Sequence, residues 1–258
     1  MEEKAEQDLG EKAARILYPL FIGQFFGILF TAVTFIVVAR LLEPVSYGIY
    51  VFAFGFSTLV NGFSGFGVGA YFSNILAKFA YKKDGEGMLR SLASGYIVAL
   101  AVGIVLTLIG IGLSGYVASL FPKVGVSVLD LELASATIIF LLINTISVSA
   151  LIGLSRTGLG SIVNVIVDIV QLALSIVLTL NFGVVGAIEG MLIGYIIGAI
   201  LGTYFVYIAI SKYVKFRMAI PPLSQVWKVF VFVTPVAWTN FLNTGMQNFF
   251  DTVSWPFC

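Results

Sequence analysis

The sequence predicts an all-α, polytopic membrane protein with one six-helix transmembrane lobe and the first helix of a second lobe. Composition is the first reason: 59% of the 258 residues are hydrophobic, 10% are charged, and the mean hydropathy is +1.05. That leaves too little polar surface to cover a soluble globule. The second reason is that the apolar residues fall into seven runs, each long enough to cross a bilayer, with short polar segments between most of them.

The first run shows the unit that the chain repeats. The 24 residues between Arg15 and Arg40 carry no charge and would form about 36 Å of helix, against a bilayer core of about 30 Å. The Glu43-Pro44 pair then ends this helix, because proline lacks a backbone donor and disfavours helix in the residue before it.

The polar breaks divide the chain. The seven predicted spans are residues 16–39, 47–76, 91–119, 133–154, 157–180, 184–210 and 229–250. We expect a cytosolic N-terminal segment at 1–15, the six-helix lobe at 16–210, a cytosolic linker at 211–228 and the first helix of a truncated second lobe at 229–258. The opening segment has five acids and three bases, unlike the basic start of a secretory signal, so the first span is expected to be retained.

Lysine and arginine predict the orientation. If the N-terminus is cytosolic, 12 of the 14 bases fall in cytosolic segments, and only Arg40 and Lys123 fall outside. Cytosolic loops of membrane proteins carry this excess of bases. We therefore predict a multi-pass protein of the cytoplasmic membrane with a cytosolic N-terminus.

Composition also excludes several kinds of chemistry. The sequence has no histidine and a single cysteine, Cys258, so His-based catalysis, His-ligated metals, an internal disulfide and a cysteine-metal cluster are excluded. No loop clusters the acids that a membrane transferase would need to hold a metal. We expect that the protein is not an enzyme and binds no cofactor. Because its apolar surface faces lipid, we also expect no nucleic-acid partner.

The fifth run carries a polar stripe at steps of 3, 4, 3, 4 and 4. The polar stripe consists of Ser161, Asn164, Asp168, Gln171, Ser175 and Thr179. This spacing places all six residues on one helix face, which must meet other helices or water because lipid cannot solvate it. We expect the hydroxyl groups to bond neighbouring helices. For Asp168, near the middle of the span, we expect a role in a cavity.

The sixth run carries a glycine ladder with one glycine every four residues. The glycine ladder consists of Gly186, Gly190, Gly194, Gly198 and Gly202. Such spacing makes a flat groove against which a neighbouring helix packs closely, so we interpret it as a packing device. Glu189, in the outer part of this run, is equally compatible with an interfacial carboxylate and with a substrate contact.

Polar residues also mark the second and seventh runs. Asn61 precedes a cluster of glycines in the second run, where close packing or a local helix break is expected. The seventh run has Asn240, Asn243, Gln247 and Asp251 at steps of 3, 4 and 4, which predicts a second polar face.

Three segments carry a resemblance to a known family. The corner Arg40-Leu-Leu-Glu-Pro-Val-Ser-Tyr-Gly-Ile-Tyr50 has the pattern R-x-L-x-P-x-x-Y-G-x-Y, Phe182 to Tyr195 contains a GxxGA motif, and Pro235 to Asp251 has a proline near its start and an aspartate at its end. In these features the chain resembles the Wzx-type polysaccharide and O-antigen flippases of the multidrug/oligosaccharidyl-lipid/polysaccharide exporter superfamily.

The resemblance implies two six-helix lobes related by a pseudo-twofold axis, of which this chain would supply the first lobe and lack about five later helices. It implies a flippase that moves a polyprenyl-linked oligosaccharide across the cytoplasmic membrane for polysaccharide biosynthesis. Its partners would be the lipid bilayer, this substrate and other polysaccharide-assembly membrane proteins. The candidate residues for the substrate pathway or for ion coupling are Gln24, Asn61, Asn164, Asp168, Gln171, Glu189, Asn240, Gln247 and Asp251.

Other functions stay open at this point. A diphosphate requires cationic partners, whereas the charges inside these spans are acidic, so cations would come from the missing half, or Asp168 and Glu189 would serve ion coupling. A cation-coupled multidrug exporter of the same fold usually has a carboxylate in its first helix, where this chain has Gln24. A non-transporting membrane scaffold and an inactive fragment are the remaining alternatives.

Overall fold

The computed structural model describes residues 2–120 and 125–211, together with 221, 226–227 and 231. It describes the backbone but not the side chains of residues 2–17 and 59–71. The predicted seventh span lies almost wholly outside the described residues, and so do its candidates Asn240, Gln247 and Asp251.

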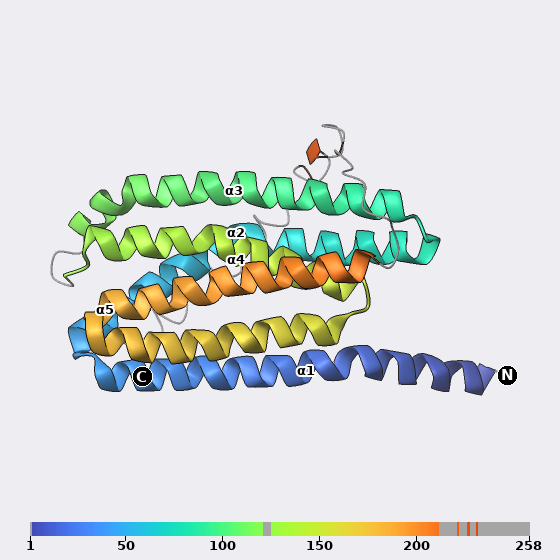
Figure 1. Cartoon of the computed structure of the whole chain (residues 1–258), viewed down its shortest axis with the longest axis horizontal. Helices are drawn as coiled ribbons and strands as arrows, with labels where there is room; N and C mark the ends of the chain where they lie inside the picture. The colour runs from blue at the N-terminus through green and yellow to red at the C-terminus, as the bar shows by residue number, and fades with distance from the viewer. Residues whose placement is uncertain (1, 121–124, 212–220, 222–225, 228–230, 232–258) are drawn as a thin grey trace, which may run out of the picture.

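Within this part of the chain all regular structure is helical. The helices are α1 (Glu2–Leu41), α2 (Pro44–Lys82), α3 (Gly85–Leu120), α4 (Val128–Gly153) and α5 (Thr157–Ser211). α5 folds back at Gly183, so the five labels comprise six helices (Figure 1). This confirms the all-α prediction and the positions of the first six predicted spans.

The corner between α1 and α2 forms as the sequence predicts, but the start of α1 differs from the prediction. α1 ends at Leu41, and α2 begins with Pro44 in its first turn, where the missing proline donor costs nothing. α1 however begins at Glu2, so the expected N-terminal segment continues the first helix. Residues 2–15 are rich in Glu, Lys and Ala, which favour helix, and this propensity extends the span beyond its apolar part.

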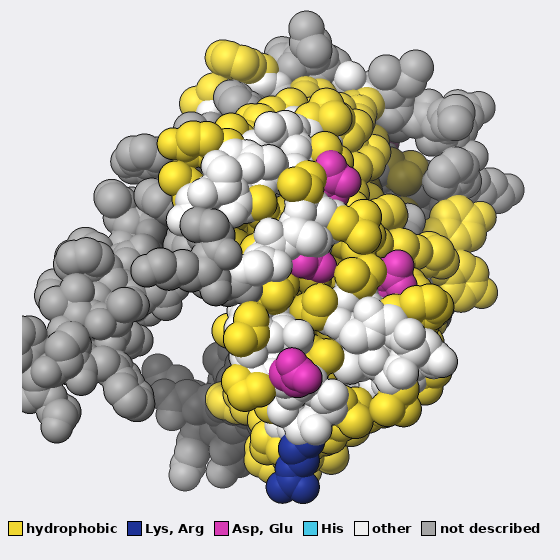
Figure 2. Space-filling model, turned by 90° about the vertical axis from the view of Figure 1, so that its left-hand side faces the viewer, with side chains coloured by type: hydrophobic (Ala, Val, Ile, Leu, Met, Phe, Trp, Pro, Cys, Tyr) yellow, Lys and Arg dark blue, Asp and Glu magenta, His cyan; other side chains and the backbone are white. Residues whose placement is uncertain are grey.

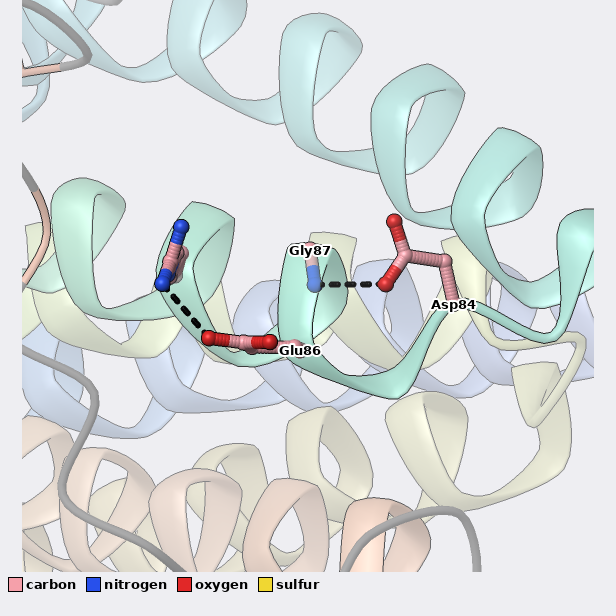
Figure 3. A network of polar contacts seen from close by, with 4 residues as sticks. Asp84, Glu86 and Gly87 are labelled. Carbon is pink, nitrogen blue, oxygen red and sulfur yellow. Dashed lines mark hydrogen bonds and ion pairs between the residues drawn. The ribbon is translucent and has the colours of Figure 1, made fainter.

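The α2–α3 corner is held by local polar contacts (Figure 3). Lys83 takes a left-handed conformation with φ of 54°, which ends α2. The Asp84 carboxylate then accepts a hydrogen bond of 2.9 Å from the Gly87 N–H in the first turn of α3. Arg90 pairs with Glu86 one turn apart. The corner is therefore fixed by its own polar groups.

α4 begins with a capping box. Ser127 Oγ accepts from the Asp130 N–H at 3.1 Å, and the Asp130 carboxylate accepts from the Ser127 N–H at 3.0 Å. Asp130 is also buried, with 2% of its surface exposed, so the capping carboxylate is shielded from solvent.

The fold-back in α5 depends on one residue. Gly183 has φ of 61° and ψ of −135°, a conformation that side chains with a Cβ rarely adopt. Its two arms, residues 157–182 and 184–211, lie antiparallel with almost no loop between them (Figure 1). The glycine ladder starts three residues after the turn, so it faces the preceding arm.

The helices pack around α4. α2, α3 and α5 all contact α4, while α1 packs chiefly against α5, as Figure 1 shows along the lower edge of the lobe. One buried cluster, including Phe72, Met88 and Ile146, joins α2, α3, α4 and α5. A second, including Tyr50 and Met191, joins α1, α2, α4 and α5 at the end where α1 meets α2.

The described lobe has the length and charge distribution of a membrane protein. Among the described residues, four segments are long and apolar enough to cross a membrane, namely Tyr18–Leu41, Gly85–Leu120, Val128–Gly153 and Thr157–Ser211. At the end that carries the N-terminus lie the corners that contain Lys82, Lys83, Arg90 and Arg156. Figure 2 shows the opposite end, where acidic side chains lie among apolar ones. This separation fits the predicted topology.

Candidate functional site

A cavity of about 710 Å³ lies inside the lobe between α1, α4 and α5. α1 lines it from Leu20 to Phe35, α4 from Asn144 to Ile152, and the first arm of α5 from Ser161 to Asp168; Tyr195 of the second arm completes the lining. We call this space the polar cavity. Its lining along α1 runs from position 20 to position 35, fifteen helical steps or about 22 Å at the helical rise.

Two glycines of α1 allow this helix to approach α5 closely. A Cβ on Gly23 would lie 2.6 Å from Ser161 Cβ, and one on Gly27 would lie 3.0 Å from Asp168 Oδ2. Ser161 Oγ also donates a hydrogen bond of 2.8 Å to the carbonyl of Pro19, which lies inside α1. The sequence analysis missed this glycine pair, although its spacing of four is the signal that identified the glycine ladder.

Three of the predicted site residues meet in the polar cavity. Gln24 reaches it from α1, and Asn164 and Asp168 reach it from α5. Asp168 is half-buried and is the charged side chain among the described residues that line this space. The cavity therefore combines one carboxyl group with amides that both donate and accept hydrogen bonds.

Two lining residues were not predicted from the sequence. Asn144 is 8% exposed, and its Oδ1 has no hydrogen-bond partner among the described residues. A lone asparagine in an apolar run was the available signal, since polar groups inside membrane helices are rarely without a role. Tyr195 adds a phenol, and no motif in the sequence points to it.

An aromatic group marks the end of the cavity near the α1–α2 corner. Phe35, the last lining residue on α1, packs against Tyr50 at 5.6 Å and against Phe54 at 5.0 Å between ring centroids. These rings belong to the buried cluster at that end of the lobe. On α4 and on the first arm of α5, the lining residues lie in the half of the helix nearer to the end that carries the N-terminus.

The remaining part of the polar stripe lies outside the cavity and packs on the glycine ladder. A Cβ on Gly194 would overlap the Gln171 side chain, and one on Gly190 would lie 2.5 Å from the Ser175 backbone nitrogen. Gln171 Nε2 donates to the Met191 carbonyl at 3.4 Å, and Ser175 Oγ donates to the Ala187 carbonyl at 3.3 Å. The packing role of the ladder is confirmed.

The ladder continues beyond the arm that it faces. A Cβ on Gly198 would meet Val167 and would lie 3.0 Å from Asn144 Oδ1, while one on Gly202 would lie 2.7 Å from Ser147 Cβ of α4. Ser147 Oγ in turn shares a hydrogen bond of 2.8 Å with the Tyr96 hydroxyl of α3. The ladder therefore joins the second arm of α5 to α4 as well, and Gly198 leaves room for Asn144 beside the cavity.

The other predicted candidates do not line the cavity in the described structure. Glu189 is partly exposed and lies on the second arm of α5, six residues after the Gly183 turn, away from Asp168. Asn61 lies in α2, but its side chain is among those not described. Of the five candidates whose side chains the structure describes, Gln24, Asn164 and Asp168 lie together in the cavity, and Gln171 and Glu189 do not line it.

Comparison with known proteins gives one family. The profile of a family described as "Polysaccharide biosynthesis protein" (Polysacc_synt) matches residues 17–258. A comparison with curated protein sequences found no significant match.

Solved structures show the same fold. The chain superposes on a transporter of the multidrug/oligosaccharidyl-lipid/polysaccharide (MOP) superfamily from Pyrococcus furiosus with a TM-score of 0.75 and 20% identity, covering 93% of this chain and 54% of that one. It superposes on a MATE transporter described as being in the straight conformation with a TM-score of 0.77 and 21% identity, covering 95% and 56%. The chain thus spans just over half the length of these structures.

Proposed function

The chain belongs to the polysaccharide biosynthesis protein family, and from this premise we propose that it acts in a flippase that moves lipid-linked oligosaccharide across the cytoplasmic membrane. The observation that supports this most is the polar cavity, which sits inside a lobe of transporter fold and is lined by Gln24, Asn144, Asn164, Asp168 and Tyr195. Saccharide hydroxyls both donate and accept hydrogen bonds, and this set of amide, carboxylate and phenol groups complements them.

Alternating access would carry the saccharide across. With the N-terminus in the cytosol, the cavity lies toward the cytosolic side, and the Phe35, Tyr50 and Phe54 rings close it toward the outside. Rocking of this lobe against a second one would then expose the saccharide to the outer side. The described chain supplies one wall of such a pathway.

Asp168 holds the charge of the cavity. A carboxylate in a half-buried site binds a hydroxyl-rich ligand or a coupling cation more readily than it binds an anion. We propose that Asp168 accepts hydrogen bonds from the saccharide or holds the coupling cation, and that the diphosphate is bound elsewhere. Polysaccharide-assembly proteins of the same membrane would be its partners, and co-purification of tagged protein from its own membranes tests this.

A reconstitution experiment tests the proposal. Proteoliposomes that contain the transporter are loaded with a fluorescent polyprenyl-diphosphate oligosaccharide, and a membrane-impermeant quencher reports its transfer between leaflets. We expect Asp168→Asn to slow transfer by roughly tenfold or more, because a hydrogen bond to a charged group contributes about 1.5–3 kcal/mol. Asp84→Asn is the matched control, since asparagine keeps the helix cap at the α2–α3 corner. Absence of transfer by the unaltered protein contradicts the proposal.

Cation-coupled multidrug export is the second candidate. One observation favours it: Asp168 and the aromatic rings of Phe35 and Tyr195 line the same cavity, and such groups bind organic cations. Susceptibility of cells to cationic dyes separates the two functions. Our proposal expects no change in susceptibility when the protein is removed, together with loss of surface polysaccharide. A non-transporting scaffold would retain partner binding but transfer no lipid.

A further inference from the structure

A second depression lies on the other side of the α1–α5 contact. This α1–α5 groove has a volume of about 440 Å³ and is lined by α1 from Tyr18 to Phe26 and by α5 from Gly158 to Ile166. Its lining side chains are apolar except for Ser161, whose hydroxyl donates to the Pro19 carbonyl, and Tyr18, whose ring is largely exposed at one end and carries a phenol hydroxyl. The groove therefore offers mainly hydrocarbon contacts.

The groove and the polar cavity lie on opposite sides of a single short helix contact. Gly23 and Ser161 line both, and they are the residues through which α1 and α5 make their closest contact. One ligand with a polar part and an apolar part can therefore lie against both surfaces across this short contact. A phospholipid acyl chain would fill the groove alone and leave the polar cavity unused.

A cation stands at the end of the groove. Arg156 lies in the α4–α5 turn, two residues before Gly158, and its side chain is exposed and has no ion pair among the described residues. Tyr18 to Phe26 spans eight helical steps, or about 12 Å, which is less than half of a bilayer core of about 30 Å. With a cytosolic N-terminus the groove lies within the cytosolic leaflet, with Arg156 at the level of the lipid phosphates.

We propose that the α1–α5 groove binds the first isoprene units of a polyprenyl-diphosphate-linked saccharide, with Arg156 facing the diphosphate and the polar cavity holding the saccharide. This inference rests on the proposed function. It adds to that function a site on the protein for the prenyl chain. It also supplies, from this chain, a cation for the diphosphate that the acidic cavity lacks. Arg156 directly precedes the segment of α5 that lines both the groove and the polar cavity, so a cation lies at the end of α5 where these two surfaces begin.

Photo-crosslinking on the full chain in lipid nanodiscs tests the groove directly. A benzophenone amino acid replaces Ile22, which is 40% exposed in the groove, and in a control it replaces Leu108, which is 62% exposed on α3. The probe is a polyprenyl-diphosphate disaccharide labelled in its prenyl chain. We expect about tenfold more labelling at position 22 than at position 108, equivalent to about 1.4 kcal/mol of preferential occupancy. Excess unlabelled probe should compete, and excess phosphatidylglycerol should not.

Two pairs of variants test the groove and the cation separately. A Cβ on Gly158 or on Gly112 has nothing within 4 Å, so Gly158→Leu adds bulk to the groove from an open Cβ position, and Gly112→Leu on α3 is its control. Arg156→Gln removes the cation, and Lys78→Gln, exposed on α2, is its control. We expect Gly158→Leu and Arg156→Gln each to lower labelling at position 22 by roughly tenfold, and the controls to leave it unchanged.

The outcomes separate this inference from the proposed function. Equal labelling at positions 22 and 108, or full competition by phosphatidylglycerol, overturns the groove assignment even if the protein transfers the lipid-linked saccharide. Selective labelling that survives Arg156→Gln overturns the role of Arg156. Selective labelling by a protein that transfers no lipid-linked saccharide supports the groove and contradicts the flippase function.

Discussion

Two parts of the polar stripe on α5 meet different surroundings, although they lie on one helix face and contain similar residues. Asn164 and Asp168 face the polar cavity, whereas Gln171 and Ser175 pack against the glycine ladder. The difference comes from the opposing helix. Near Asp168 the neighbours are α1 and the Asn144 side chain, which leave space, and near Ser175 the neighbour is a glycine backbone, which leaves none. A polar helix face thus lines a binding site only where the opposing helix leaves space for a ligand.

The largest expected effect comes from a substitution that forces the glycine ladder away from the polar stripe. In Gly190→Val the new Cβ would lie 2.5 Å from the Ser175 backbone nitrogen, which cannot move without shifting the helix. We expect a loss of about 3 kcal/mol of stability, the upper range for overpacking. Thermal unfolding of the purified protein in detergent measures it. Gly112→Val, where nothing lies within 4 Å of the new Cβ, should change stability by at most about 0.5 kcal/mol; equal losses in the two variants would contradict the packing role.

The turn that brings ladder and stripe together gives the next largest effect. Gly183→Val forces a β-branched residue into φ of 61° and ψ of −135°, and we expect a cost of about 2 kcal/mol. Unfolding in a denaturant series provides the measurement. Gly115→Val, in α3 with open space around its Cβ, serves as the control. A neutral Gly183 variant would show that the turn can relax without strain.

A substitution in the part of the polar stripe that lines the cavity should change saccharide transfer and leave stability unchanged. Asn164→Ala removes an exposed amide that lines the cavity, so we expect about tenfold weaker saccharide transfer, or about 1.4 kcal/mol, with the unfolding temperature unchanged. The quenching assay with lipid-linked oligosaccharide measures the transfer. A drop in stability without a change in transfer would assign Asn164 to packing.

A substitution in the part of the polar stripe that packs on the glycine ladder should lower stability and leave transfer unchanged, and this effect is the smallest of those predicted. Ser175→Ala removes a hydrogen bond to the Ala187 carbonyl, and such bonds between membrane helices contribute about 0.6 kcal/mol. We expect a slightly lower unfolding temperature and full transfer. Slower transfer in Ser175→Ala, at unchanged stability, would extend the site into the packed part of the stripe.

The sequence alone predicts the helices and the polar face well, because both depend on local patterns. Runs without charge locate the spans, Pro44 locates the first corner, and residue spacing gathers the stripe on one face. Spacing also identifies the glycine ladder, whose packing role the structure confirms.

The sequence does not show which helix packs against each face of a given helix. Gln171 shares the spacing of Asp168, yet it packs on Met191, and nothing in the stripe itself distinguishes the two residues. Asn144 lies in a run whose other polar residues are serines and threonines, and its place beside the cavity depends on the absence of a side chain at Gly198. These contacts join residues far apart in the chain, which local patterns do not encode.

The turn at Gly183 also bears on how the protein is made. Because the two arms of α5 are joined with almost no loop, neither can enter the bilayer far ahead of the other, and they are expected to insert as a helical hairpin. Their contacts link residues close in sequence, such as Ser175 and Ala187, so the chain can form them as soon as both arms have left the ribosome. During biogenesis the pairing of stripe and ladder would then also shield the polar face of the first arm from lipid.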